Sequence, residues 1–241
     1  MEIIAHRGAS GYAPENTRVS ILKGLELGCD GFEVDVQLAG SGEVVVFHDF
    51  TLERTTSGKG SLRDIDLSDL RKLDLGSSFS EEFKGEKIMT LEELLRIVPE
   101  NKILNIEIKV RYDEVNKIEE KIVDILKKAG RIEGQIIISS FSHRIIKEIN
   151  ELEPDLKTGL LLTAGILDIE NYIKTNDLKI YSVHTYGEFT GRKMVKKMND
   201  IGIKTYIWTV NNAEEAKMLK DFGVTGIITN YPDKFKEVRG I

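Results

Sequence analysis

The sequence predicts an α/β fold, a closed TIM or (β/α)8 barrel with a short insertion after the second strand. Short apolar runs typical of buried strands alternate eight times with segments that have the apolar spacing of helices. The length of 241 residues is that of one barrel, and we expect residues 1–241 to form a single domain. A doubly wound sheet is the alternative. Neither glycine-rich phosphate fingerprint expected of that fold follows the first strand.

The expected elements follow one another in a regular order. Strands are expected at residues 3–5, 32–36, 103–108, 136–139, 158–162, 180–183, 204–210 and 226–229. Helices are expected after them at residues 15–27, 90–98, 114–128, 143–152, 167–174, 189–201, 213–222 and 233–238. The second helix has the clearest boundaries, because Thr90 and Glu93 match a capping box and Pro99 ends the helix.

The insertion is the polar segment at about residues 51–87. Four glycines interrupt it, and one short helix is expected near residues 68–73. We expect this segment to lie over the barrel, because it is too poor in apolar residues to form a core of its own.

Composition excludes several classes of protein. The net charge of −6 argues against a nucleic-acid surface, which needs a basic stripe. A single cysteine, Cys29, excludes an internal disulfide and fits a reducing compartment. No apolar run approaches the length of a membrane span, and the N-terminus does not resemble an export signal. We therefore expect a cytoplasmic protein without membrane insertion. Nothing in the sequence specifies an oligomeric state.

Three carboxylates fall near the ends of neighbouring strands. Glu33 and Asp35 are two residues apart in the alternating segment 32–36, so they share one face of the strand. Glu107 ends the next strand of the barrel. Buried carboxylates need compensation, and three oxygen ligands favour a hard cation such as Mg²⁺ or Ca²⁺, with Mn²⁺ also possible. Zinc is disfavoured, because no histidine pair with ligand spacing accompanies them.

Basic side chains follow the same strand ends. His6 and Arg7 follow the first strand, and Lys109 follows Glu107 on the same face. A barrel gathers the carboxyl ends of its strands at the rim that carries active sites. The sequence therefore predicts one rim with carboxylates, two cations and an imidazole.

A hairpin is expected to bring a second imidazole, His48, to this rim. If Ser41 and Gly42 form a two-residue turn, Asp35 lies opposite His48 and the two share a face. A three-residue loop would slip the register by one position and turn His48 away.

Several of these residues also have a purely structural interpretation. Lys109 could pair with Glu107 as a salt bridge at the rim. His143 stands at an expected helix start and is interpreted as structural, whereas His184 ends the sixth strand and could line the rim. Trp208 lies at a strand end and is a candidate wall for a bound alcohol or headgroup.

Together these residues indicate metal-assisted cleavage of a phosphodiester. A cation beside Arg7 and Lys109 would attract and polarise a phosphate. His6 and His48 could act as acid and base, because imidazole titrates near neutral pH.

Five motifs resemble the signature of the glycerophosphodiester phosphodiesterases. Weaker matches continue to the C-terminus, so the similarity covers essentially the whole chain in the right order. The five motifs are His6-Arg7-Gly8 with Pro14-Glu15-Asn16-Thr17, Glu33-Val34-Asp35-Val36, His48-Asp49, Leu52-Glu53-Arg54-Thr55-Thr56 and Glu107-Ile108-Lys109.

The resemblance implies a TIM barrel that releases glycerol 3-phosphate and an alcohol from deacylated phospholipids. The implied route is attack by the glycerol 2-hydroxyl, which gives a cyclic phosphate that water then opens. The site residues that the resemblance implies are the cation ligands Glu33, Asp35 and Glu107, the acid–base pair His6 and His48, and the phosphate-binding side chains Arg7 and Lys109.

The sequence departs from the family pattern in three places. Ser57 stands where Asn is usual, Ala39-Gly40-Ser41 replaces Thr-Lys-Asp before the hairpin glycine, and Asn230 replaces an Asp after the last strand. We expect none of these departures to touch a position proposed for catalysis or metal binding, although the second bears on the loop that aims His48.

Three other functions are compatible with parts of the sequence. A relative acting on lysophospholipids or phosphoinositol esters would share the core chemistry, but the short polar insertion favours small water-soluble diesters. A non-catalytic binder of phosphorylated metabolites would not need both His6 and His48. A glycosidase using Glu33 and Glu107 should work without a metal.

Overall fold

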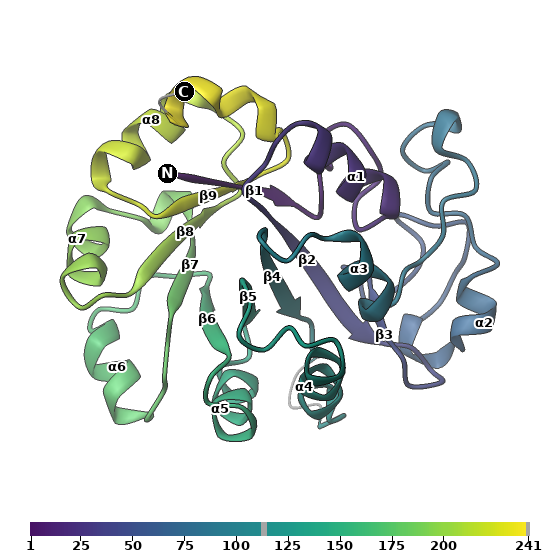
Figure 1. The fold of residues 1–241 in the computed structure, drawn as a ribbon, viewed down its shortest axis with the longest axis horizontal. Helices are drawn as coiled ribbons and strands as arrows, with labels where there is room; N and C mark the ends of the chain where they lie inside the picture. The colour runs from purple at the N-terminus through teal and green to yellow at the C-terminus, as the bar shows by residue number, and fades with distance from the viewer. Residues whose placement is uncertain (112–114, 240–241) are drawn as a thin grey trace.

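The chain forms a closed barrel of parallel strands surrounded by helices (Figure 1). The computed structural model describes residues 1–111 and 115–239. The strands are β1 (Glu2–His6), β2 (Gly31–Leu38), β3 (Val44–Val46), β4 (Ile103–Ile108), β5 (Ile136–Ser140), β6 (Lys157–Leu162), β7 (Ser182–Tyr186), β8 (Lys204–Trp208) and β9 (Gly226–Thr229). The helices are α1 (Arg18–Glu26), α2 (Leu67–Leu70), α3 (Leu91–Ile97), α4 (Ile118–Lys128), α5 (His143–Leu152), α6 (Ile169–Thr175), α7 (Arg192–Asp200), α8 (Ala213–Phe222) and α9 (Lys236–Arg239).

The barrel closes because β1 pairs in parallel with both β2 and β9. Around the ring the order continues through β8, β7, β6, β5 and β4 back to β2, all in parallel. Only β3 is antiparallel, and it extends the sheet beside β2. The predicted fold class is therefore confirmed, with eight parallel strands and one hairpin arm outside the ring.

Most elements lie where the sequence predicts them. β4, β9, α5 and α8 have the expected bounds, whereas β7 lies two to three residues further along the chain than expected. The helix expected from residue 114 begins at Ile118, and residue 114 lies outside the described part. The longest described helix, α4, has 11 residues, and no described helix is long and apolar enough to cross a membrane.

Capping boxes define the starts of α1 and α3. The predicted box at Thr90 and Glu93 begins α3. The first helix starts later than expected, because Thr17 caps α1 through the backbone N–H of Ser20. The residue before this cap, Asn16, has a φ of +58° and donates its side-chain amide to Asp35 in the barrel, so the chain cannot be helical there.

The outer face of the barrel forms the main apolar core. Phe32, Val34 and Val36 of β2 are buried against residues of α1, α3 and α4. Because side chains alternate along a strand, Glu33 and Asp35 must then face the barrel interior. Burial of the apolar face is thus what aims the two carboxylates inward.

The hairpin differs from expectation in its register. Leu38 pairs with Val44, so the turn has three residues, 40–42, instead of two. The expected pairing of Asp35 with His48 is therefore wrong.

His48 nevertheless reaches the barrel mouth, so the expectation that this register would turn it away is also wrong. Strand β3 ends at Val46, and His48 lies beyond it. The direction of the His48 side chain therefore does not follow the alternation of side chains along the strand. The Gln37 side-chain amide holds this segment by donating to the backbone oxygens of Phe47, His48 and Asp49 at 2.8–3.0 Å. A side chain of β2, and not the hairpin register, thus places His48.

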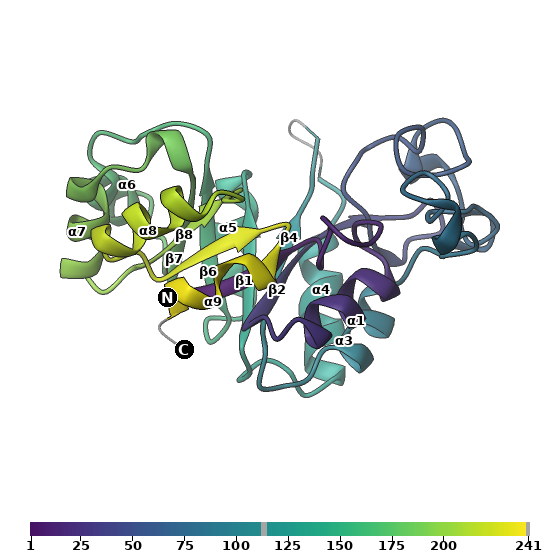
Figure 2. The same ribbon diagram turned by 90° about the horizontal axis from the view of Figure 1, so that it is seen from above.

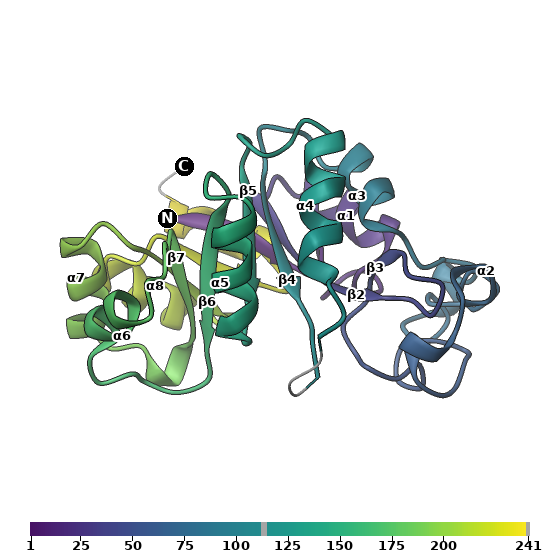
Figure 3. The same ribbon diagram turned by 90° about the horizontal axis from the view of Figure 1, so that it is seen from below.

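The insertion projects to one side of the barrel, beyond α1 and α3 (Figures 2 and 3). It contains α2 and two short 3₁₀ turns, Leu62–Asp64 and Glu81–Phe83. As expected, it has no separate core of its own among the described residues, because its few apolar side chains are buried together with those of the hairpin. The buried cluster comprises Ala39, Val45, Phe47, Leu52, Leu62, Leu70, Leu75 and Ile88.

Candidate active site and metal centre

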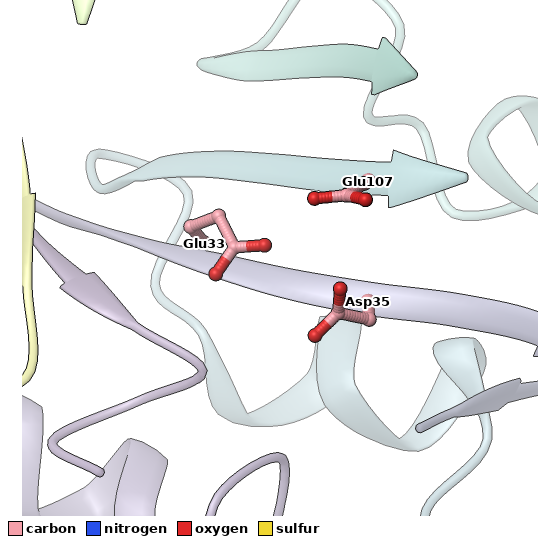
Figure 4. A group of neighbouring side chains, drawn as sticks. All are labelled: Glu33, Asp35 and Glu107. Carbon is pink, nitrogen blue, oxygen red and sulfur yellow. The ribbon is translucent and has the colours of Figure 1, made fainter. Parts of the chain in front are cut away.

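Three buried carboxylates point toward one another inside the barrel mouth (Figure 4). Asp35 of β2 is directly opposite Glu107 of β4 in the parallel register. Glu33 lies two residues before Asp35 on β2 and points to the same face. Each residue offers one oxygen, and these oxygens all lie within 4.8 Å of one another. The three residues predicted as cation ligands are thus brought together by two adjacent strands.

The electrostatics of this group fit a bound cation. Burial, then the charges of Asp35 and Glu107, raises the pKa of Glu33 well above its usual value. Burial and the charge of Asp35 raise the pKa of Glu107 to about 7. Asp35 Oδ1 is buried and has no hydrogen-bond partner in the described part of the chain. The three carboxylates would repel one another if all were ionised, and one of their oxygens accepts no hydrogen bond from the described residues. A hard divalent cation would offset this repulsion and use that oxygen as a ligand.

Arg7 and Asn16 contact the outer side of this group. Arg7 adopts a φ of +55° at the end of β1, and its backbone N–H donates to Glu33 Oε2 at 3.1 Å. Its guanidinium Nε lies 3.3 Å from Asp35 Oδ2, which also accepts from Asn16 Nδ2 at 2.9 Å. Arg7 is therefore held beside the carboxylates, where the sequence predicted it.

Lys109 and His48 lie together on the other side. Lys109 Nζ is 2.9 Å from Glu107 Oε1, so the salt bridge considered from the sequence does form. The same ammonium is 3.8 Å from Asp35 Oδ1 and 3.3 Å from His48 Nε2. The salt bridge thus aims Lys109 into the site. Burial, together with the charges of Lys109 and Arg7, lowers the pKa of His48.

These side chains open onto a cavity of about 110 Å³ at the carboxyl ends of the strands. One side is polar, and the other is apolar, with Phe141, Leu161, Trp208 and Ile228. A larger groove of about 780 Å³ lies outside the barrel between α1, α3 and residues 85–89, and it contains none of the candidate site residues. The smaller cavity has the shape and polarity of a site for a phosphate with an organic substituent.

Residues 6–234 match the model of the glycerophosphoryl diester phosphodiesterase family. The chain belongs to this family. A glycerophosphodiester phosphodiesterase of Caldanaerobacter subterraneus is 38% identical over 232 residues, covering 96% of this chain and 94% of that protein. One of Bacillus subtilis is 35% identical, covering 98% and 85%. The structure of an Oleispira antarctica phosphodiesterase in complex with the product sn-glycerol-3-phosphate matches with a TM-score of 0.91 and 29% identity, covering 100% and 97%.

One departure from the family pattern does touch the site. Asn230, where the glycerophosphodiester phosphodiesterases usually have Asp, places its side-chain oxygen 2.6 Å from His6 Nδ1. We expected no such contact, because the two residues are 224 positions apart and only barrel closure joins β1 to β9. Burial and the charge of Arg7 lower the pKa of His6 to about 4, although the hydrogen bond to Asn230 acts in the opposite direction.

Three of the family motifs contribute a side chain to which the sequence assigned no role: Glu15, Asp49 and Arg54. Asp49 Oδ1 lies 2.5 Å from His48 Nδ1, and Arg54 binds both oxygens of Asp49. The Arg54 guanidinium also donates to both oxygens of Glu15, at 2.8 Å each. Glu15 in turn accepts from Arg7 Nη1 at 2.9 Å. In the sequence, only their positions within the family motifs indicated that Glu15, Asp49 and Arg54 belong to the site.

A fourth residue to which the sequence assigned no role, Asn105, lies on the cavity wall. Asn105 of β4 is opposite Glu33 and buried, and among the described residues neither its amide nitrogen nor its amide oxygen has a hydrogen-bond partner. Buried amides are nearly always paired, so this one is poised for water or substrate.

The two remaining histidines are structural. His143 begins α5 as expected, and its ring nitrogens lie 2.7 Å from the Tyr172 hydroxyl and 3.2 Å from the Leu161 oxygen. His184 does not line the rim. It is buried inside the barrel, 2.8 Å from Ser182 Oγ and against the Tyr206 ring.

Proposed function

We propose that this chain is a metal-dependent glycerophosphodiester phosphodiesterase, which hydrolyses deacylated phospholipids to glycerol 3-phosphate and an alcohol. One observation carries the proposal: two cationic side chains, two imidazoles and two carboxylates line one cavity at the carboxyl ends of the strands, and the third carboxylate, Asp35, is buried beside the other two. Family membership supports the reaction class, and the bound product of the Oleispira relative supports the substrate class.

In this proposal Glu33, Asp35 and Glu107 hold one divalent cation. Mg²⁺ and Ca²⁺ suit such an oxygen ligand set, and Mn²⁺ is also compatible with it. When bound, the cation would supply positive charge that polarises the phosphoryl group.

Arg7 and Lys109 would bind the phosphate oxygens from either side of the carboxylates. Each is already oriented by an ion pair, Arg7 with Glu15 and Lys109 with Glu107, both at 2.9 Å. Charge-assisted hydrogen bonds to phosphate are stronger than neutral ones, and little side-chain entropy remains to be lost.

His6 and His48 would transfer the protons. Their Nδ1 atoms face Asn230 and Asp49, so the substrate would meet the Nε2 atoms, and that of His48 lies 3.3 Å from Lys109 Nζ. One imidazole would take the proton of the glycerol 2-hydroxyl as its oxygen attacks phosphorus. The other would protonate the departing alcohol oxygen. Water would then open the cyclic phosphate with the two roles reversed. Trp208 would form the wall beside the alcohol.

The test is release of glycerol 3-phosphate from glycerophosphocholine and glycerophosphoethanolamine. The protein is treated with a chelator and then given Mg²⁺, Mn²⁺ or Ca²⁺ separately. We expect activity to vanish with the chelator and to return with at least one cation. No activity with any cation on these substrates would contradict the proposal.

The roles of the histidines are tested with His6→Ala and His48→Ala. Each should abolish turnover and spare cation binding measured by calorimetry. His143→Ala is the matched control, because its ring faces the Tyr172 hydroxyl and the Leu161 backbone oxygen and is not part of the cavity lining. Unchanged turnover in both site variants would overturn the acid–base assignment.

A further inference from the structure

An arc of aromatic side chains leads from the apolar wall of the cavity onto the barrel rim. The Tyr186 ring lies 5.5 Å from that of Trp208 and 5.9 Å from that of Phe189, between centroids. Phe141 continues the arc on the other side of Trp208, at 5.8 Å. Tyr186 and Phe189 are 39% and 50% exposed, although aromatic rings normally bury most of their surface. This surface is contiguous with the proposed active site.

The outer part of the arc is held in place by its own loop. Tyr186 ends β7, and Phe189 follows in the 3₁₀ turn Gly187–Phe189. Thr190 closes this turn: its N–H donates to the Gly187 oxygen, and its hydroxyl donates to the Tyr186 oxygen, both at 3.0 Å. Hydrogen bonds within the loop therefore hold the backbone that carries the two exposed rings.

Two carboxylates flank the exposed end of the arc. Glu188 lies between the two aromatic residues in sequence, and Glu215 lies in the first turn of α8. A Cβ built on Gly187 would be 2.4 Å from Glu215 Oε1, which places that carboxylate directly against the turn. Within residues 1–111 and 115–239, neither Glu188 nor Glu215 forms an ion pair. Burial and the charge of Glu188 raise the pKa of Glu215.

With a cation held by Glu33, Asp35 and Glu107 as proposed above, the cavity and its rim would have opposite charges at their two ends. The inner end carries Arg7 and Lys109, and Lys109 Nζ also lies 5.8 Å from the Phe141 ring centroid. The outer end carries aromatic faces and two unpaired carboxylates. Aromatic faces attract cations, most strongly quaternary ammonium groups, and carboxylates add to that attraction.

We propose that Trp208, Tyr186 and Phe189, with Glu188 and Glu215, form a subsite for a cationic alcohol group, such as the trimethylammonium of choline. The inference rests on the proposed function, because it assigns the leaving group of the same reaction. A zwitterionic diester matches this polarity: its phosphate lies at the basic end, and its ammonium group, a short spacer away, lies against the rings.

The first test is direct binding, which requires neither metal nor turnover. Trp208 is the only tryptophan of the chain, so its fluorescence reports on this wall. Choline is compared with 3,3-dimethylbutan-1-ol, which has the same shape without the charge. We expect saturable quenching by choline at concentrations about tenfold lower than those needed for the uncharged alcohol. Equal responses, or none, would overturn the proposal.

The second test compares turnover of glycerophosphocholine with that of its 3,3-dimethylbutyl analogue. We expect the intact enzyme to favour the choline ester by about tenfold in kcat/KM. Tyr186→Leu with Phe189→Leu should remove the preference while keeping apolar contact, and Glu188→Gln with Glu215→Gln should weaken it. Glu151→Gln is the matched control, an exposed carboxylate on α5 for which no ion pair is found in the described part.

The outcomes separate this inference from the proposed function. Preferential choline binding without turnover of any diester would retain the subsite and reject the phosphodiesterase. Equal turnover of both esters, with no preferential choline binding, would retain the phosphodiesterase and reject the subsite. A preference that grows with alkyl chain length instead would overturn the cationic assignment in favour of an acyl chain.

Discussion

Arg54 binds Asp49 through two hydrogen bonds, from Nε to Oδ2 at 2.6 Å and from Nη2 to Oδ1 at 2.9 Å. Asp49 contacts His48, and Arg54 also binds Glu15, the partner of Arg7. One side chain of the insertion therefore orients both an imidazole and a guanidinium of the site.

We predict that Arg54→Gln lowers kcat by about tenfold to a hundredfold, because a small misplacement of a catalytic group is costly. Arg54→Lys should recover part of the loss, since one charge remains without the bidentate geometry. Arg71→Gln is the control, because it breaks an exposed ion pair with Glu93 elsewhere in the insertion. Steady-state kinetics at fixed cation concentration measure this. Equal losses in Arg54→Gln and Arg71→Gln would show a general effect of the insertion.

The same network predicts an acid-sensitive contribution to stability. Burial acts to raise the pKa of Glu15, but Arg54 and Arg7 lower it to about 2, and Arg54 and His48 lower the pKa of Asp49 to about 2. Both lie below the values of the unfolded chain, near 4. The stabilisation is therefore complete above about pH 5 and is lost as the pH falls towards 2.

Denaturant unfolding measured from pH 7 to pH 2 checks this prediction. Arg54→Gln should reduce the free energy of unfolding at pH 7 and flatten its decline towards low pH. An unchanged slope in the variant would contradict the assignment of these shifts to Arg54.

The contact between His6 and Asn230 predicts a shift in the pH–rate profile. Asn230→Asp would place a carboxylate 2.6 Å from the imidazole, where Asn230 now stands. A neighbouring negative charge favours protonated imidazole, so the pKa of His6 should rise. The limb of the kcat/KM profile that reports His6 should therefore move to higher pH. Asn199→Asp, on the outside of α7, is the control and should leave the limb in place.

The carboxylate cluster predicts opposite effects of one substitution with and without metal. Glu33→Gln removes a buried charge beside Asp35 and Glu107, so it should raise the melting temperature of the chelated protein. The expected rise is roughly 2–4 °C for each kcal/mol of repulsion relieved. The same variant should lose the stabilisation that an added divalent cation gives the parent protein. Calorimetric scans of both proteins, with chelator and with Mg²⁺, measure the two effects. A chelated variant that melts lower than the parent would contradict the account.

We predict that Asn105 contributes more to substrate binding than to the stability of the fold. Because its amide has no hydrogen-bond partner in the described part of the chain, Asn105→Leu should leave stability unchanged or raise it by about 1 kcal/mol, while KM rises. Asn150→Leu is the matched control: that buried amide bonds Thr158 and Lys179. Its loss should destabilise the protein by about 1–3 kcal/mol without changing KM. A large stability loss in Asn105→Leu would argue for an ordered water as its partner.

Local patterns in the sequence predicted the barrel and the carboxylate cluster. Alternation along residues 32–36 determines that Glu33 and Asp35 share a face, and burial of Phe32 and Val34 determines which face that is. Parallel pairing then places Glu107 opposite Asp35. These relations depend on strand period and strand order, and both can be read from the chain.

Contacts between distant segments required the tertiary structure. His48 lies beyond the hairpin ladder, where strand period no longer applies, and the Gln37 side chain holds it. Asn230 reaches His6 only because β9 closes the ring against β1.

The sequence alone thus determined the fold class and the faces on which the candidate ligands lie, because those follow from periodic burial. The tertiary structure decided the orientation of His48 by Arg54 and Asp49, the partner of His6 and the aromatic arc at the rim. Each of these depends on loops whose geometry is set by hydrogen bonds to other parts of the barrel, and local residue patterns do not encode such bonds.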